Sequence, residues 1–144
     1  MIEARFIETK LFYIQGYFKE LEDILAYSDQ EIKKDFFKIR ALERILQLIV
    51  DEIIDINNHI IRYARLNIPD DFQSSFLILA ENKIFPKHFA EKIAPVVGLR
   101  NRLVHRYEKV DLHILLDSIR KNKVDFREYV KYIRPHPFFS IPIP

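Results

Sequence analysis

The chain has 144 residues, enough for one domain with a full core and too few for two, and its composition of 49% hydrophobic and 31% charged residues is that of a globular protein. It contains no cysteine, which excludes disulfides and thiolate metal sites, and no stretch reaches the roughly 18–20 apolar residues that a membrane-spanning helix needs. The net charge is only +2, and the first residues lack the apolar segment of a signal peptide, so we expect a cytoplasmic protein that does not enter a membrane.

The first part of the chain is typical of long helices. It has no proline before Pro69 and no useful run of alternating polar and apolar residues, which makes strands improbable and predicts an all-α fold. Apolar residues recur at intervals of three and four from about Glu3 to Tyr27 and predict a first helix. Ser28 and Glu31 form a capping box, which predicts a second helix that begins here.

The second helix is predicted to continue to about Leu66, because its apolar residues follow a heptad-like spacing. Additional apolar positions widen the stripe, which suits a bundle with several neighbours better than a two-stranded coil. The spaced positions are Leu42, Leu46, Ile49, Ile53, Ile56, Ile60 and Tyr63, and the widening positions are Ile45, Leu48 and Ile61.

Proline and aspartate mark the boundaries of the remaining elements. The sequence at 67–69 (NIP) ends the second helix, and Asp70 or Asp71 can cap a short third helix that ends near Asn82. A fourth helix is predicted from Pro86 toward Tyr107, with a kink at Pro95.

The chain is predicted to close with a fifth helix and a proline-rich tail. Asp111 can cap the fifth helix, which should run to about Ile133. We therefore expect one helical domain over residues 1–133, followed by a tail over 134–144 whose prolines prevent a helix.

The segment Arg100–Tyr107 (RNRLVHRY) concentrates groups that bind phosphate and transfer protons. It lies in a stretch, residues 83–109, that holds seven basic and two acidic residues, whereas residues 1–30 hold three basic and six acidic ones. An anionic partner would therefore dock on this segment, although a solvated helix face is the common alternative. Leu103 and Val104 are expected to face the core.

These residue types suit cleavage of RNA without a metal ion. The reaction needs a base for the ribose 2′-hydroxyl, an acid for the leaving 5′-oxygen and a cation for the phosphoryl oxygens. His105 could transfer the proton, Arg100 could hold the phosphate bidentately, and Asn101 could orient the imidazole or hydrogen-bond the phosphate. Arg102 and Arg106 are predicted to contact the substrate and to add salt-dependent affinity.

The spacing of the two central residues is a difficulty for a site on one helix. Arg100 precedes His105 by five residues, which on a straight helix places them about 140° apart. Either the arginine side chain wraps round, or the helix distorts, or two copies share one site. A symmetric dimer with a cleft between its copies resolves the difficulty most simply.

The motif also carries a family resemblance. Arg100, Asn101, His105 and Tyr107 match the Arg-x4-His-x-Tyr pattern, with Asn after the Arg, of the HepT-like HEPN ribonuclease toxins. The chain resembles this family from about Ile39, through ALERILQLIVDEIIDINNHI and PDDFQSSFLILAENKIF, to the end of the fifth helix.

The resemblance implies an all-α, HEPN-type, four- to five-helix up-down bundle that acts as a homodimer with the motif helices along a shared cleft. It implies a metal-independent endoribonuclease toxin of a toxin–antitoxin system, with no cofactor of its own. The implied antitoxin is a minimal nucleotidyltransferase that transfers AMP from ATP to the motif tyrosine, here Tyr107, whose alternative role is an aromatic packed on the bundle.

Other interpretations of the sequence are possible. Glu52, Asp55 and His59 share a helical face and could form half of a metal site, but no matching motif occurs on another helix, and a polar contact between Asp55 and His59 inside the bundle is favoured. The alternative function is a non-catalytic HEPN dimer that binds or regulates a nucleotidyltransferase. Binding to DNA is not expected, because no helix-turn-helix spacing occurs.

Overall fold

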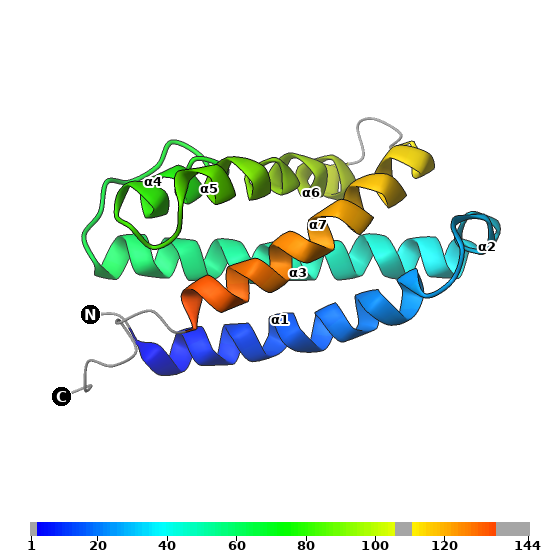
Figure 1. The fold of residues 1–144 in the computed structure, drawn as a ribbon, viewed down its shortest axis with the longest axis horizontal. Coiled ribbons are helices and arrows are strands. Elements are labelled where there is room, and N and C mark those ends of the chain that lie inside the picture. Colours follow the sequence, from blue (N-terminus) through cyan, green and yellow to red (C-terminus); the bar gives the residue numbers. More distant parts are fainter. Residues whose placement is uncertain (1–2, 106–110, 135–144) are drawn as a thin grey trace.

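The computed structural model describes residues 3–105 and 111–134, which form seven α-helices and no strand (Figure 1). The predicted all-α bundle is confirmed. The helices of the described residues are α1 (Ala4–Leu25), α2 (Asp29–Lys34), α3 (Phe36–Tyr63), α4 (Ser75–Glu81), α5 (Lys87–Ile93), α6 (Pro95–His105) and α7 (Leu112–Ile133).

Helix α3 is the central element of the bundle. Helix α1 packs along one side of it, while α4, α5 and α6 form a layer along another side and α7 crosses diagonally over the bundle (Figure 1). Of the predicted seam on α3, six residues are buried, and Tyr63 is the exception with 38% of its surface exposed. The apolar stripe on α3 is too wide for a single neighbouring helix to cover, and it is buried because helices pack on several sides of α3.

The expected second helix is in fact two helices. The Ser28 hydroxyl accepts a hydrogen bond from the main chain three residues later, as predicted, but α2 ends after six residues. Asp35 then adopts an extended backbone, and its carboxylate accepts from the N–H groups of Phe37 and Lys38. The prediction of one uninterrupted helix to Leu66 was wrong because this aspartate caps a new helix.

Helix α3 ends two to three residues before the predicted position and turns into the α3–α4 loop. Arg65 has a φ of 56°, and the N–H of Leu66 donates to the carbonyl of Ile61 over 2.9 Å, as in a Schellman cap. After the loop, Asp71 accepts from the N–H of Ser74 and caps a turn, so that α4 begins only at Ser75.

Pro95 divides the predicted fourth helix into α5 and α6. The proline is the first residue of α6, where its missing N–H removes no helical hydrogen bond. Asp111 caps α7 as predicted, and α7 ends at Ile133. All of the predicted tail except its first residue, Arg134, lies outside the described residues, so the domain division stays a prediction. None of the described helices is both long and apolar enough to cross a membrane.

A buried polar network connects α3, α4 and α7. The Tyr129 hydroxyl donates to Asn57 over 2.5 Å, and the Asn57 amide donates to the Ser75 hydroxyl over 3.0 Å. The Ser75 hydroxyl in turn donates to the main-chain carbonyl of Phe72 over 2.6 Å. Because all three side chains are buried, the network fixes the end of the α3–α4 loop to the core.

Candidate active site

Helix α6 carries the described part of the motif along one side of α3. Leu99 and Leu103 are buried and hold the helix in the bundle. Val104 is 41% exposed, so the prediction that it would face the core was wrong. At 100° per residue, Val104 lies on a different face from Leu99, and only one stripe of a short helix at the bundle surface is covered.

The guanidinium of Arg100 is held by two neighbours. Its Nε donates to a carboxylate oxygen of Asp51 on α3 over 2.8 Å, and its Nη2 lies 2.8 Å from the same oxygen. Its Nη1 donates to Asn101 over 3.1 Å. Each terminal nitrogen carries two N–H groups, so both keep donor capacity beyond these contacts with described residues. The side chain, 21% exposed, is therefore oriented yet still able to bind an anion.

His105 is exposed at the last residue of α6. Because α6 is helical from Pro95 to His105, the angle of about 140° between Arg100 and His105 is retained. The helix does not distort to bring the two groups to one face. Arg102 is also exposed, whereas Arg106 and Tyr107 lie outside the described residues.

Asn101 connects Arg100 to a cavity of about 490 Å³ between α3, α6 and the α3–α4 loop. A cavity of this size falls within the range of small-molecule sites, about 300–1,000 Å³. Its lining residues are Asn58, Ile68, Pro69, Asp70, Asp71, Phe72, Gln73, Val97 and Asn101.

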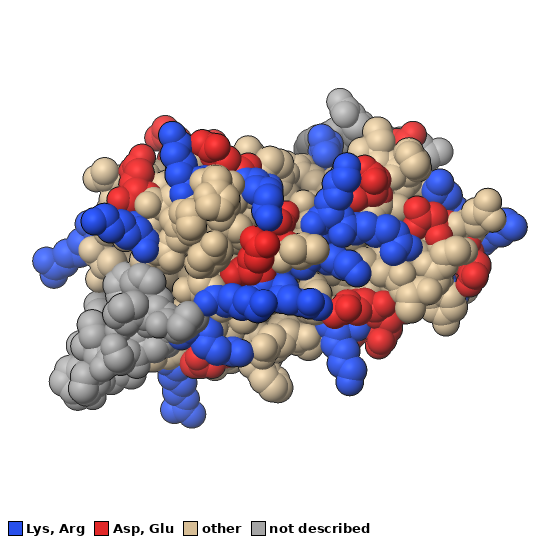
Figure 2. Space-filling view, in the orientation of Figure 1, with Lys and Arg blue, Asp and Glu red and all other residues tan. Residues whose placement is uncertain are grey.

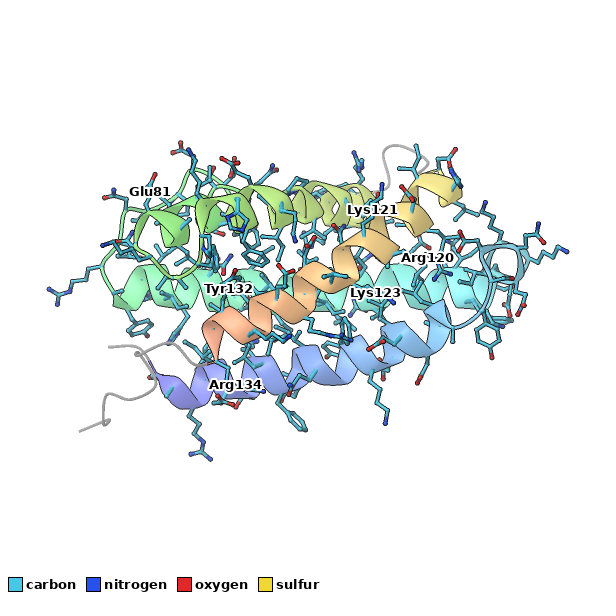
Figure 3. All side chains as sticks on the ribbon, in the orientation of Figure 1. Glu81, Arg120, Lys121, Lys123, Tyr132 and Arg134 are labelled. Atoms are coloured by element: carbon cyan, nitrogen blue, oxygen red, sulfur yellow. The ribbon has the colours of Figure 1, made fainter. Side chains whose placement is uncertain are left out.

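A larger cavity of about 620 Å³ lies between α1 and α7, away from the motif. Two of its three basic residues are engaged with neighbours: Arg127 contacts Glu22 and the Phe18 ring, and Arg134 contacts Gln15 and Glu8. The third, Lys131, is exposed. Figure 2 shows that basic and acidic side chains are intermingled on this face, and Figure 3 places Arg134 at the end of α7 beside α1. The face lacks the uniform positive charge of a phosphate-binding surface.

The acids considered as metal ligands are occupied by a lysine. Lys10 Nζ lies 3.0 Å from Glu52 and 2.9 Å from Asp55. His59 accepts from the N–H of Glu3, just before α1, over 3.0 Å. The expected contact between Asp55 and His59 is therefore replaced by separate contacts, of Asp55 with Lys10 on α1 and of His59 with Glu3. Within residues 3–105 and 111–134, no three side chains of ligand type gather into a metal site.

Asp51 is the site residue that sequence reasoning missed. It lies 49 residues before Arg100, and nothing local relates the two. A signal was nevertheless present, because Asp51 and Asn58 are seven residues apart and share a face of an isoleucine-rich helix. Polar residues repeated on one face of such a helix indicate contacts with another element.

Comparison with known proteins gives a family match over residues 14–133, to the family described as ribonuclease HepT-like. An mRNA nuclease HepT from Shewanella oneidensis is 30% identical over 89% of this chain and 96% of its own length. A tRNA nuclease HepT from Aphanizomenon flos-aquae is 33% identical over 94% of this chain and 92% of its own length.

Solved structures show the same fold. A tri-AMPylated HEPN toxin from Shewanella oneidensis, in complex with MNT antitoxin, superposes with a TM-score of 0.86 at 28% identity, covering 93% of this chain and 100% of that one. The protein YutE from Bacillus subtilis superposes with a TM-score of 0.85 at 19% identity, covering 99% and 96% of the two chains, and supports the fold alone.

Proposed function

Because this chain belongs to the HepT-like ribonuclease family, we propose that Arg100 and His105 perform its cleavage of RNA by attack of the ribose 2′-hydroxyl. The observation that carries the assignment is the fixed guanidinium of Arg100, which Asp51 and Asn101 orient while leaving donors for a phosphate. The chain is thus a ribonuclease of the toxin–antitoxin class, and we expect it to act in the cytoplasm.

In the proposed reaction, the 2′-oxygen attacks phosphorus and the bond from phosphorus to the 5′-oxygen breaks. An imidazole takes the 2′-hydroxyl proton and an imidazolium supplies a proton to the 5′-oxygen, leaving a 2′,3′-cyclic phosphate and a 5′-hydroxyl. Arg100 stabilises the charge on the phosphoryl oxygens. Histidine can accept the proton of the 2′-hydroxyl and can supply the proton to the 5′-oxygen, so the proposed step requires no metal ion or other cofactor.

We propose that the active form is a homodimer with α6 of each copy along one cleft. The support is the angle of about 140° between Arg100 and His105, which one copy of the helix does not close. Two facing copies would supply two imidazoles and two guanidiniums to one phosphodiester. Arg102, exposed on the same helix, and Arg106 would contact neighbouring phosphates.

We further propose that a minimal nucleotidyltransferase is the antitoxin, and that it transfers AMP from ATP to Tyr107. The related toxin from Shewanella oneidensis is tri-AMPylated and bound to MNT antitoxin, which supports this assignment. Phosphates attached two residues from His105 would occupy the basic site and repel RNA.

The test is cleavage of a labelled single-stranded RNA by purified protein in EDTA. Wild type should generate a 2′,3′-cyclic phosphate end, and His105→Ala should lower kcat/KM by about 10²–10⁴-fold, the usual contribution of general acid–base catalysis. His113→Ala is the matched control, because His113 is an exposed histidine on α7, and it should retain wild-type activity. Wild type that is inert in EDTA, or His105→Ala that remains active, would contradict the proposal.

A further inference from the structure

We infer that the cavity beside Asn101 is a nucleobase subsite, which binds an unpaired base of the RNA next to the phosphate that is cut. The inference rests on the proposed function, since it assigns the scissile phosphate to Arg100 and His105. It adds a site of specificity built by the α3–α4 loop, α3 and the start of α6.

The position of the cavity supports this assignment. Asn101 lines the cavity and accepts a hydrogen bond from Arg100, so a single residue separates the cavity from the phosphate-binding guanidinium. His105 lies one turn further along α6, about 6 Å along the helix axis at 1.5 Å per residue. A nucleotide whose phosphate contacts Arg100, with the imidazole supplied by either copy of the proposed dimer, can therefore place its base, or that of its neighbour, in the cavity.

The side chains around the cavity suit a base rather than a phosphate. Phe72 is 48% exposed and offers a ring for stacking. Asn58, Gln73 and Asn101 bring amides that both donate and accept, as the edge of a base requires. The lining contains no lysine or arginine.

The acids of the cavity indicate which bases it takes. Asp70 and Asp71 line the cavity, and a carboxylate repels a phosphate but accepts a hydrogen bond from an exocyclic amino group. Asp71 Oδ1 accepts from the N–H of Ser74 and caps the turn, whereas Asp70 is exposed, so we assign Asp70 as the main acceptor for the base. Adenine, cytosine and guanine carry such an amino group and uracil does not, so the subsite should discriminate against uracil.

The wall that carries Phe72 is fixed before any ligand binds. Its carbonyl accepts from Ser75, and Ser75 belongs to the buried network with Asn57 and Tyr129. The turn that Asp71 caps extends to Ser74 and therefore includes Phe72 itself. A fixed wall lowers the entropy lost on binding, which favours recognition by a preformed cavity.

The inference is tested with short single-stranded RNAs that differ only in the bases on either side of one cleavable bond. Wild type should prefer an amino-bearing base over uracil at one of these positions. Phe72→Ala should lower kcat/KM by about 5- to 150-fold, which corresponds to the value of about 1–3 kcal/mol for stacking one base. Asp70→Asn should weaken the discrimination against uracil. Phe12→Ala is the matched control, because Phe12 is an exposed phenylalanine on α1, and it should behave as wild type.

A second measurement separates this inference from the proposed function. Fluorescence anisotropy of an oligonucleotide with a 2′-deoxy substitution at the cleavage position reports binding without cleavage, and Phe72→Ala should weaken this binding while Phe12→Ala should not. Equal effects of the two substitutions in both assays, or cleavage by wild type that is indifferent to both flanking bases, would overturn the subsite. Wild type that binds with the predicted base preference but never cleaves would overturn the proposed function alone.

Discussion

The buried network around Asn57 makes a quantitative prediction for Tyr129→Phe. The substitution removes the hydroxyl that donates to Asn57 and leaves a fully buried acceptor without its donor. A lost hydrogen bond costs about 1 kcal/mol and an unpaired buried group about 1–3 kcal/mol, and the relief from burying a hydroxyl offsets part of this. We expect a loss of about 2 kcal/mol in the free energy of unfolding, or about 4–8 °C in Tm.

The assay is urea unfolding followed by circular dichroism, with Tyr132→Phe as the matched control. Tyr132 lies one turn away on α7, half-buried against Phe85 and Phe89, and its hydroxyl bonds to no described residue. The control should change stability by less than about 0.5 kcal/mol. An equal effect of the two substitutions would refute the reasoning that the network, rather than ring packing, provides the stability.

Wild type and Tyr129→Phe should also differ in how their free energies of unfolding respond to alkaline pH. Burial raises the pKa of Tyr129 well above its ordinary value. Above about pH 10 the unfolded chain releases the phenol proton while the native protein retains it, so wild type loses stability as the pH rises. Tyr129→Phe lacks this group, and the difference in stability between the two proteins should therefore narrow above pH 10.

Two further substitutions test electrostatic contacts elsewhere in the bundle. Burial raises the pKa of Asp125, and Lys92, 3.1 Å away, opposes the shift. Lys92→Met should therefore lower the urea midpoint at pH 7, and the loss should shrink near pH 4 as Asp125 takes up a proton; an equal loss at both pH values would contradict the assignment. Burial lowers the pKa of His59, so the unfolded chain binds a proton before the native protein does as the pH falls below about 6.5, and the stability of wild type falls with the pH. His59→Phe should therefore reduce the difference in urea midpoint between pH 8 and pH 5.5. An unchanged difference would contradict the assignment.

The sequence predicted the fold where one signal dominated. The stripe on α3 and the aspartate before α7 each act locally, and both predictions were confirmed. Pro95 was predicted to kink one helix and instead begins a new one, so its position was recognised but its effect was underestimated. Asp35 shows the limit of such patterns. An aspartate on a helix surface and an aspartate that caps a new helix look alike in sequence, and only the packing of α2 against α3 decides between them.

The candidate site was predicted in its chemistry but not in its support. Arg100, Asn101 and His105 follow from the motif, since their residue types and spacing are local. Asp51, and Phe72 of the proposed base subsite, do not, because each is brought near Arg100 and Asn101 by the packing of α3 or its following loop. Long-range pairing of this kind depends on how α3 and α6 pack, which no local spacing encodes.

The placement of Asp51 and Asn58 on the same helix, α3, has a consequence for how the enzyme can diverge. Asp51 and Asn58 are separated by seven residues, so the carboxylate that orients Arg100 and an amide that lines the proposed base subsite stand about 10 Å apart on one helix, at 1.5 Å per residue. If the base binds in the proposed subsite, insertions in the α3–α4 loop would alter which base is accepted and would leave the spacing along α3 between the subsite and Arg100 unchanged. Divergence in target sequence is thus separated from the position of the cut.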